Sequence, residues 1–466
     1  MRPILLGVIS RVPKDWNNAL LSVRIVSRFK PSQAIHDLGE EFFDPVQPAN
    51  FNPVGIRFVN ANLAEEIGLK LSEADTLKHF LRFEPIDNSL SEPLALRYHG
   101  HQFRQYNPEI GDGRGFLFAQ FEHEGRLLDF GTKGSGTTPY SRQGDGRLTL
   151  LGGVREVLAS EYLNALGVNT SRAFTLIETD EALTRHDEPS PTRAAVLTRL
   201  SHSHIRFGTF QRQAFFGKTE NLEALVKYCQ MHFYPGAETT SAFFEQVVKQ
   251  SADTIAAWMV AGFVHGVMNT DNMNITGESF DYGPYRFLPT LDPGYTAAYF
   301  DYNGLYAFGR QPEAMSWNLA QLAQSLSLIC EDALLIDSLN DFAPRYQSAL
   351  NRHVFRRLGI ASKDEETDSA FARALFIYLK DSQVPWPEFW HDWQGGASRS
   401  SKDQIGTYDA EWTARLKAFD VVAERPKTDM PNSLLYEEIG QIWQPIAEAD
   451  DWTAFKQKTV SLAAGA

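Results

Sequence analysis

The feature that most limits how this chain can fold is a change of hydrophobic periodicity near residue 219. Before that point, apolar residues mostly follow the short alternating runs typical of strands, with a few helical patterns among them. The strand-like runs are residues 116–123, 126–133, 171–179 and 192–200. The helical patterns are two short ones at 60–72 and 73–83 and a longer one at 152–166. After it the spacing is helical, most clearly in a long buried stripe over residues 243–268. The order predicts an α+β chain in which a β-rich lobe precedes a helical lobe.

These patterns divide the 466 residues into three parts, and a chain of this length can form one large two-lobed enzyme. The three parts are an amino-terminal arm, a β-rich lobe with glycine-rich loops and a helical lobe, at residues 1–37, 38–235 and 236–466. A polar loop at 265–284 follows the long helical stripe. Polar breaks at 361–369 and 395–404 predict surface loops.

The composition narrows the choice of partners and compartment. A formal charge of -14 argues against nucleic acid, whose binding needs a basic surplus. No apolar run approaches the length of about 18 residues that spans a bilayer, so we expect no membrane partner. Cys229 and Cys330 have no CxxC spacing, which predicts reduced thiols in a cytoplasmic protein. Residues 1–36 carry six Lys or Arg and only Asp15, which faintly resembles a mitochondrial presequence if the source is eukaryotic, but a simple flexible or edge-packing arm is the favoured interpretation.

A glycine-rich turn precedes the predicted hairpin and suggests a phosphate site. Gly111 and Gly113 let backbone N–H groups approach phosphate oxygens, and Lys133 at the end of the second strand adds a positive charge. Glu156 on the following helix can pair with Lys133 and fix it over the phosphates. An ordinary hairpin turn and a solvated helix residue explain the same glycines and the same Glu156.

The next segment, residues 133–147, is too polar and too long for a simple connector. Asp145 and Gly146 at its end can meet a base, a ribose or a phosphate, although a turn at Gly-Asp-Gly is the ordinary alternative. Arg199 and Arg206 lie seven residues apart and can make bidentate contacts to phosphate oxygens, with surface salt bridges as the alternative.

The polar loop 265–284 resembles the catalytic loop of a kinase without its base. His265 and Asn272 stand where an HxDxxxxN loop has its His and Asn, but the position of the base is Val267. Asn272 and Asp281 supply hard oxygen ligands suited to Mg²⁺ or Mn²⁺. Asp271, directly before Asn272, is a further carboxylate in the loop, and it is either a base or a residue of an Asx-turn or helix cap. Together with strand, strand, helix, strand, strand in the first lobe, the loop predicts a protein-kinase-like ATP site.

Three long stretches resemble the selenoprotein O (SelO) family. They are "YHGHQFRQYNPEIGDGRGFLF", "DFGTKGSGTTPYSRQGDGRLTLLGGVREVLASEYLNALGV" and "HGVMNTDNMNITGESFDYGP". The resemblance implies a kinase-like fold that binds ATP in a flipped orientation and transfers AMP to Ser, Thr or Tyr hydroxyls of proteins, possibly of itself, with release of pyrophosphate. It also implies the role of each motif residue: nucleotide contacts by Gly111, Gly113, Arg114, Asp145 and Gly146, phosphate contacts by Lys133 (held by Glu156), Arg199 and Arg206, a base at Asp271, and metal ligands at Asn272 and Asp281.

A flipped nucleotide explains the missing base. AMP transfer requires the α-phosphorus to face the hydroxyl, so the β- and γ-phosphates turn inward, where extra arginines are needed. Val267 is then expected, and the proton acceptor moves to Asp271. Two alternatives stay open on the residues alone: a kinase that transfers the γ-phosphoryl group, and a scaffold that binds ATP without catalysis.

Many members of that family end in a Cys or selenocysteine, and some pair a carboxy-terminal Cys with one near the activation loop. The sequence "KTVSLAAGA" at residues 458–466 and the segment "LDPGYTAAYFD" at residues 291–301, which follows Asp281, contain no Cys. We therefore expect no intramolecular disulfide to switch the activity of this chain.

Overall fold

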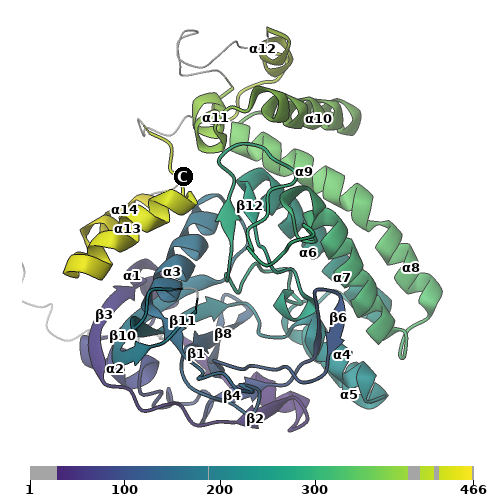
Figure 1. The fold of residues 1–466 in the computed structure, drawn as a ribbon. Coiled ribbons are helices and arrows are strands. Elements are labelled where there is room, and N and C mark those ends of the chain that lie inside the picture. The colour runs from purple at the N-terminus through teal and green to yellow at the C-terminus, as the bar shows by residue number, and fades with distance from the viewer. Residues whose placement is uncertain (1–28, 187, 397–409, 424–429, 464–466) are drawn as a thin grey trace, which may run out of the picture.

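The computed structural model describes residues 29–186, 188–396, 410–423 and 430–463. One large antiparallel sheet dominates the amino-terminal half, and helices dominate the carboxy-terminal half (Figure 1). This arrangement confirms the predicted α+β class and fits the two lobes of a protein-kinase-like fold. Residues 1–28 of the predicted arm lie outside the described residues, and Lys30–Ser32 of that arm form strand β1.

The sheet has the strand order β2-β4-β7-β8-β11-β10-β3, with β1 added beside β7 and β9 beside β11. Its strands are β1 (Lys30–Ser32), β2 (Phe43–Pro45), β3 (Pro53–Val59), β4 (Leu94–Leu96), β7 (Leu117–His123), β8 (Arg126–Lys133), β9 (Leu148–Thr149), β10 (Arg172–Leu183) and β11 (Thr192–Ser201). The predicted hairpin is β7–β8, whose tight turn places Glu124 and Gly125 at positive φ. All four predicted strands are therefore present.

The register of β8 and β11 places two predicted site residues together. Lys133 lies opposite Leu197, and Arg199 lies opposite Gly131. Opposite residues point to the same face of a sheet, and so do residues two apart on one strand. Lys133 and Arg199 therefore share a face at adjoining positions.

The predicted helix of the first lobe is α3 (Leu150–Ala165), which packs against β10 and β11. It begins where the side chain of Thr149 accepts a hydrogen bond from the N–H of Gly152, an N-cap contact. Val154, Val157, Leu158 and Leu163 face the core as the spacing predicts. The two short helical patterns predicted at 60–72 and 73–83 are confirmed as α1 (Ala61–Glu66) and α2 (Glu73–Phe80). A small hairpin of β5 (Gly100–Gln102) and β6 (Gln105–Asn107) completes this lobe.

Helical structure begins earlier than predicted, at α4 rather than near residue 219. The helices of this part are α4 (Phe207–Phe215), α5 (Thr219–His232), α6 (Thr240–Ala261), α7 (Gln311–Leu326), α8 (Asp332–Asn340), α9 (Phe342–Leu358), α10 (Glu365–Ser382), α11 (Trp386–Trp393), α12 (Ala410–Leu416), α13 (Tyr436–Ala449) and α14 (Thr453–Ala463), with short 3-10 turns η2 (Thr270–Asn272) and η3 (Phe308–Arg310). A further 3-10 turn, η1 (Ala34–Leu38), lies between β1 and β2 in the first lobe. Of the described helices, none is long and apolar enough to cross a membrane.

Two boundaries differ from the sequence pattern. Helix α6 ends at Ala261 rather than near residue 268, because Gly262 adopts the left-handed conformation that commonly ends helices. The polar break at 361–369 is only partly a loop: Asp364 accepts a hydrogen bond from the N–H of Thr367 and starts α10. Residues 397–404 of the second predicted loop lie outside the described residues.

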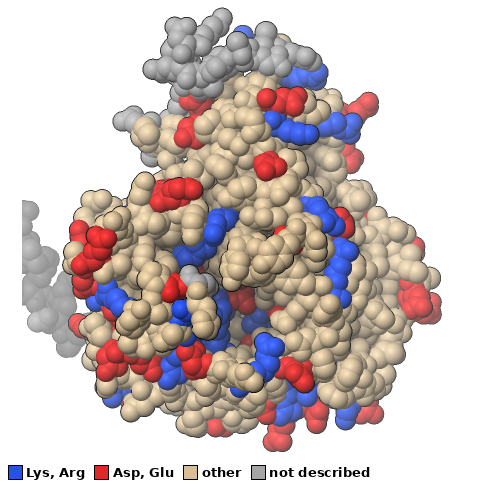
Figure 2. Space-filling model, in the orientation of Figure 1, with Lys and Arg blue, Asp and Glu red and all other residues tan. Residues whose placement is uncertain are grey.

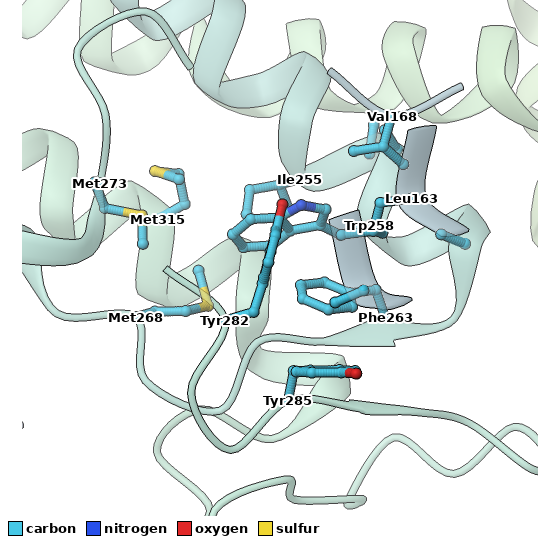
Figure 3. Close-up of a cluster of buried hydrophobic side chains, with 14 of the residues drawn as sticks. Leu163, Val168, Ile255, Trp258, Phe263, Met268, Met273, Tyr282, Tyr285 and Met315 are labelled. Carbon is cyan, nitrogen blue, oxygen red and sulfur yellow. The ribbon is translucent and has the colours of Figure 1, made fainter. Parts of the chain in front are cut away.

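The polar loop 265–284 after α6 is held at both ends by a pair of short strands and by an aromatic cluster. Strands β12 (Phe263–Val264) and β13 (Arg286–Phe287) pair with each other and hold the two ends of the polar loop together. Trp258, Phe263, Tyr282 and Tyr285 pack together (Figure 3). The indole of Trp258 also donates a hydrogen bond to the hydroxyl oxygen of Ser279 at 2.9 Å. A loop held at both ends can present its polar side chains in fixed positions.

Candidate nucleotide-binding and catalytic site

A cavity of about 870 Å³ lies between the sheet and the helical part, and its lining is strongly polar. Lys and Arg side chains gather around a hollow near the middle of the face shown in Figure 2. Every predicted site residue except Glu156 lines this cavity: Gly111, Gly113, Arg114, Lys133, Asp145, Gly146, Arg199, Arg206, Asp271, Asn272 and Asp281. A nucleoside triphosphate fits a cleft of this size.

Glu156 lies directly behind Lys133 and orients it. The Lys133 ammonium contacts one carboxylate oxygen of Glu156, and the guanidinium of Arg199 lies 3.5 Å from the other. Glu156 is 3% exposed, so it is not the solvated helix residue that its sequence position alone suggested. The buried pair fixes both cations at the inner wall of the cavity.

Three cations converge on the carboxylate of Asp281. Lys133 Nζ lies 2.8 Å from Oδ1, Arg199 lies 3.7 Å from the same oxygen, and Arg206 lies 3.6 Å from Oδ2. Although burial alone would raise the pKa of Asp281, these cations hold it well below its ordinary range. Asp281 also has φ of +64°, a left-handed conformation that is uncommon for a residue other than glycine. The site thus carries a concentrated positive charge around one ionised carboxylate.

Arg206 is held rigidly by neighbours on four segments. Its guanidinium donates to the Asp271 carbonyl at 2.8 Å and contacts the Asp112 carboxylate at 3.2 Å. It also stacks between the rings of Tyr98 and Phe280, 4.6 and 4.7 Å from their centroids. The alternative of surface salt bridges is excluded, because Arg199 and Arg206 are 7% and 5% exposed.

Asp271 is a buried carboxylate with an unused oxygen. Its Oδ2 accepts a long hydrogen bond of 3.4 Å from the side chain of Gln102, and Oδ1 has no hydrogen-bond partner. Burial raises the pKa of Asp271 to about 6, against the opposing effect of Arg206. Such a group is largely ionised at pH 7 and can still accept a proton.

His265 supports the loop from below. Its Nε2 lies 3.1 Å from the Phe280 carbonyl oxygen, and its backbone N–H donates to the side chain of Gln311. Burial lowers the pKa of His265, so the ring is neutral and its N–H donates to that carbonyl. The ring ties the start of the loop to the residue before Asp281.

Asn272 and Asp281 form a donor set that suits a hard divalent cation together with phosphate oxygens. The side-chain amide nitrogen of Asn272 donates a hydrogen bond to the Val267 carbonyl at 3.0 Å. The side-chain carbonyl oxygen of Asn272 is therefore the atom that can coordinate a metal. Within the described residues, no group of three or more His, Cys, Asp or Glu side chains could hold a metal by itself. A cation here therefore needs oxygens from the nucleotide as well, as in phosphoryl-transfer enzymes.

The glycine-rich turn makes room for a tyrosine as well as for a ligand. A Cβ on Gly111 would lie 2.4 Å from the ring of Tyr140, and one on Gly113 would lie 3.0 Å from the Tyr140 carbonyl. The hydroxyl of Tyr140 donates a hydrogen bond to the carboxylate of Asp44. The absence of side chains at 111 and 113 thus lets the loop 138–146 fold over the turn and close one side of the cavity.

Asp145 and Gly146 lie at the cavity rim, where Asp145 is already paired. Its carboxylate accepts two hydrogen bonds from Arg185, at 2.8 and 3.1 Å. Gly146 has φ of +70°, and a Cβ there would lie 2.2 Å from the Gly136 carbonyl oxygen, so glycine is required for this turn. Arg114 lies beside them, exposed, at the same rim.

Sequence reasoning missed four residues that the fold brings into the site. Asp112 and Tyr98 hold Arg206, Gln102 contacts Asp271, and Arg185 pairs with Asp145. Asp112 lies inside the glycine-rich turn and could have been considered with it. The other three contacts depend on chain crossings that no local pattern encodes.

A two-lobed α+β fold, a strand lysine paired with a helix glutamate, and an Asn–Asp pair in the following loop together define a kinase-like nucleotide-transfer site. A family model described as protein adenylyltransferase SelO matches residues 26–463. The chain therefore belongs to the SelO family, as its motifs indicated, and it is a nucleotidyltransferase.

Curated relatives are similar over nearly the whole chain. A "Protein nucleotidyltransferase YdiU" of Synechocystis sp. is 43% identical, covering 93% of this chain and 97% of the relative. One of Gloeobacter violaceus is 41% identical, covering 94% and 95%, and one of Vibrio cholerae is 38% identical, covering 80% and 74%. The predicted enzyme class and its adenylyl-transfer activity are confirmed by these matches and the family model.

Proposed function

We propose that this nucleotidyltransferase moves AMP from ATP to Ser, Thr or Tyr hydroxyls of proteins and releases pyrophosphate, with the triphosphate entering the cavity first. The observation that carries the proposal is the convergence of Lys133, Arg199 and Arg206 at the buried end of the cavity. Three fixed cations match the charge of a β,γ-diphosphate better than that of an adenosine. The α-phosphorus then lies nearer to the outside, where an acceptor protein can reach it.

In this reaction the acceptor oxygen forms a bond to the α-phosphorus while the bond from that phosphorus to the β-phosphate oxygen breaks. Asp271, which lines the cavity, takes the proton of the hydroxyl on its carboxylate. Lys133, Arg199 and Arg206 stabilise the charge that develops on the departing pyrophosphate. Val267 leaves no carboxylate at the usual kinase position, which supports a reaction centred on Asp271 instead.

Asn272 and Asp281 would hold Mg²⁺ or Mn²⁺ against the phosphate oxygens. A divalent cation there neutralises phosphate charge and orients the reacting group. Asp281 suits this role because it stays ionised over the whole physiological pH range. Gly111, Gly113, Arg114, Asp145 and Gly146 would contact the remainder of the nucleotide at the rim.

The acceptors would be proteins, possibly including this chain itself, and the site of action would be the cytoplasm. The printed description of the family, protein adenylyltransferase, supports a protein acceptor. The net charge of -14 argues against a nucleic-acid acceptor.

The test is incubation with Mg²⁺ or Mn²⁺ and ATP labelled on either the α- or the γ-phosphate. Label from the α-position alone on protein supports the proposal, and Asp271→Asn should abolish it while ATP still binds. Label from the γ-position alone would instead identify a kinase, and no label despite ATP binding would identify a scaffold.

A further inference from the structure

Beside the cavity lies an exposed aromatic surface formed by Tyr299, Phe300 and Tyr302, with the partly buried Phe103 packed against Phe300. Tyr299 is 75% exposed, Phe300 39% and Tyr302 88%, and Tyr299 itself lines the cavity together with Asp271. Folded proteins seldom expose large aromatic side chains in such a cluster unless the surface binds something.

This surface is rigidly connected to the catalytic loop. Phe300 packs edge-on against Phe103 at 5.8 Å, and Phe103 packs against Tyr306 at 5.0 Å. The backbone N–H of Phe103 and the hydroxyl of Tyr306 both donate to the side chain of Asn269, at 3.0 and 2.9 Å. Asn269 is two residues before Asp271, so the aromatic surface holds a fixed position relative to the proposed base.

The segment 299–302 is also anchored from inside. Asp301 is 6% exposed, and its carboxylate accepts hydrogen bonds from the N–H groups of Leu305 and Tyr306. Because Asp301 points inward, its neighbours Phe300 and Tyr302 are turned toward the outside. The exposure of these rings is thus built into the fold rather than left to a free loop.

We propose that this surface docks the segment of the acceptor protein that carries the hydroxyl, by taking an apolar side chain next to it. The proposal rests on the proposed function, because it requires a protein hydroxyl to reach Asp271. Asp271 and Tyr299 line the same cavity, so an acceptor that approaches Asp271 from outside passes these rings. Rigid aromatic side chains bind apolar groups with little loss of conformational entropy, which suits a docking surface.

The experiment measures transfer of α-labelled AMP to two probes. One is dephosphorylated casein, and the other is a pair of peptides with a single serine flanked on both sides by either Leu or Gln. The enzymes are wild type, Phe300→Ala/Tyr302→Ala, the ring-retaining Tyr302→Phe, and Ile377→Ala as a matched control, since Ile377 is 55% exposed on α10.

We expect the double alanine variant to lose about tenfold in kcat/KM for casein, with the KM for ATP unchanged. Wild type should prefer the Leu peptide, and the double variant should lose that preference. Tyr302→Phe and Ile377→Ala should behave as wild type, because the ring and not the hydroxyl makes the contact.

Wild-type rates on casein with the double alanine variant would overturn the docking surface. Loss of casein labelling by Tyr302→Phe would overturn it too, because it would show that the hydroxyl of Tyr302 and not its ring is needed. A wild-type enzyme that transfers only γ-label would instead refute the proposed function itself, so the two failures are distinguishable.

Discussion

The charge around Asp281 shows how one residue can hold a site together before its substrate arrives. Lys133, Arg199 and Arg206 would repel one another if they shared no counter-ion, since all three lie within 4 Å of the same carboxylate. Asp281 therefore stabilises the empty site, and we propose that it then serves the metal when nucleotide binds. Its left-handed backbone places the carboxylate in this position.

Substitution of Asp281 by Asn should separate these roles. The amide keeps the shape but removes the charge, so we expect AMP transfer to fall by about 10²- to 10³-fold. The melting temperature should change little once ATP is present, because phosphates then supply the missing charge. Transfer of α-label and thermal unfolding with and without ATP measure both effects. Near-normal transfer by Asp281→Asn, with Asp292→Asn as the exposed control, would place the metal site elsewhere.

A second carboxyl in the same loop, Glu278, makes stability depend on pH. Burial raises the pKa of Glu278 to about 8, although the hydrogen bond from the backbone N–H of His202 opposes that change. The folded chain thus keeps a proton that the unfolded chain releases above its ordinary pKa of 4.5. Stability contributed by this group is present at low pH and is lost as the pH rises toward 8.

Replacing Glu278 by Gln should remove this dependence. Between pH 6 and pH 8 the wild-type free energy of unfolding should fall by up to about 2 kcal/mol more than that of Glu278→Gln. Urea unfolding of both proteins at the two pH values measures the difference. Equal pH dependence in the two proteins would show that Glu278 does not titrate in this range.

At the scale of elements, the site depends on how β8 and α3 approach each other. The Lys133–Glu156 contact joins the end of a strand to the middle of a helix, and both side chains are buried. Removing one member of such a pair leaves an unpaired charge in the interior, which is more harmful than removing both.

We therefore expect Lys133→Met to lower the free energy of unfolding by up to about 3 kcal/mol. The double variant Lys133→Met/Glu156→Gln should recover most of that stability, because neither charge is then left unpaired. It should remain inactive, because no lysine is left to bind the phosphates of ATP. Chemical denaturation and α-label transfer measure the two properties. Recovery of transfer together with stability would show that Lys133 acts only in folding.

The β5–β6 hairpin is the second element that positions the site. A Cβ added to Gly100 would lie 2.6 Å from Oδ1 of Asp271, so Gly100→Ala must displace that carboxylate. We expect kcat to fall by about 10- to 100-fold while ATP still binds, since displacements near 1 Å strongly reduce rates. Steady-state kinetics and ATP-binding measurements follow both quantities.

Gly440→Ala is the matched control for this substitution. Gly440 lies inside α13 with open space around it, so Ala should leave kcat unchanged and stabilise the helix by about 0.5–1 kcal/mol. A Gly100→Ala enzyme as active as this control would contradict the close packing of hairpin and base.

At the scale of the whole molecule, the end of the chain returns to the first lobe. Helices α13 and α14 lie along α3 (Figure 1). The guanidinium of Arg57 stacks on Trp452 at 4.9 Å, Arg193 donates to the Ile446 carbonyl, and Phe455 packs edge-on against Phe58. Because α3 carries Glu156, these last helices support the site from outside it.

Phe455→Ala should test this support. Phe455 is 1% exposed, so truncation should cost about 3–5 kcal/mol of stability and loosen α14 from α3. Amide hydrogen exchange in residues 150–165 should rise and transfer should fall. Val460→Ala, at a position 71% exposed on α14, should change neither. Normal exchange in α3 despite lost stability would show that the two helices are not coupled.

Much of the site was predictable because its residues lie in locally ordered motifs. The hairpin and α3 follow from short-range periodicity, and the loop 265–284 keeps a fixed spacing between His265, Asn272 and Asp281. The end of α6 was harder to predict from the sequence. The apolar stripe continues past it, and the helix stops only because Gly262 adopts the left-handed conformation.

The sequence by itself determined the α+β order, the family and the chemical types of the site residues. Only the tertiary structure decided that Arg206 is clamped by Asp112 and Tyr98, that Asp271 keeps one free oxygen, and that aromatic rings stand exposed beside the cavity. Spacing and periodicity describe residues a few positions apart, whereas burial and charge pairing depend on segments far apart in the sequence that meet only in the folded chain.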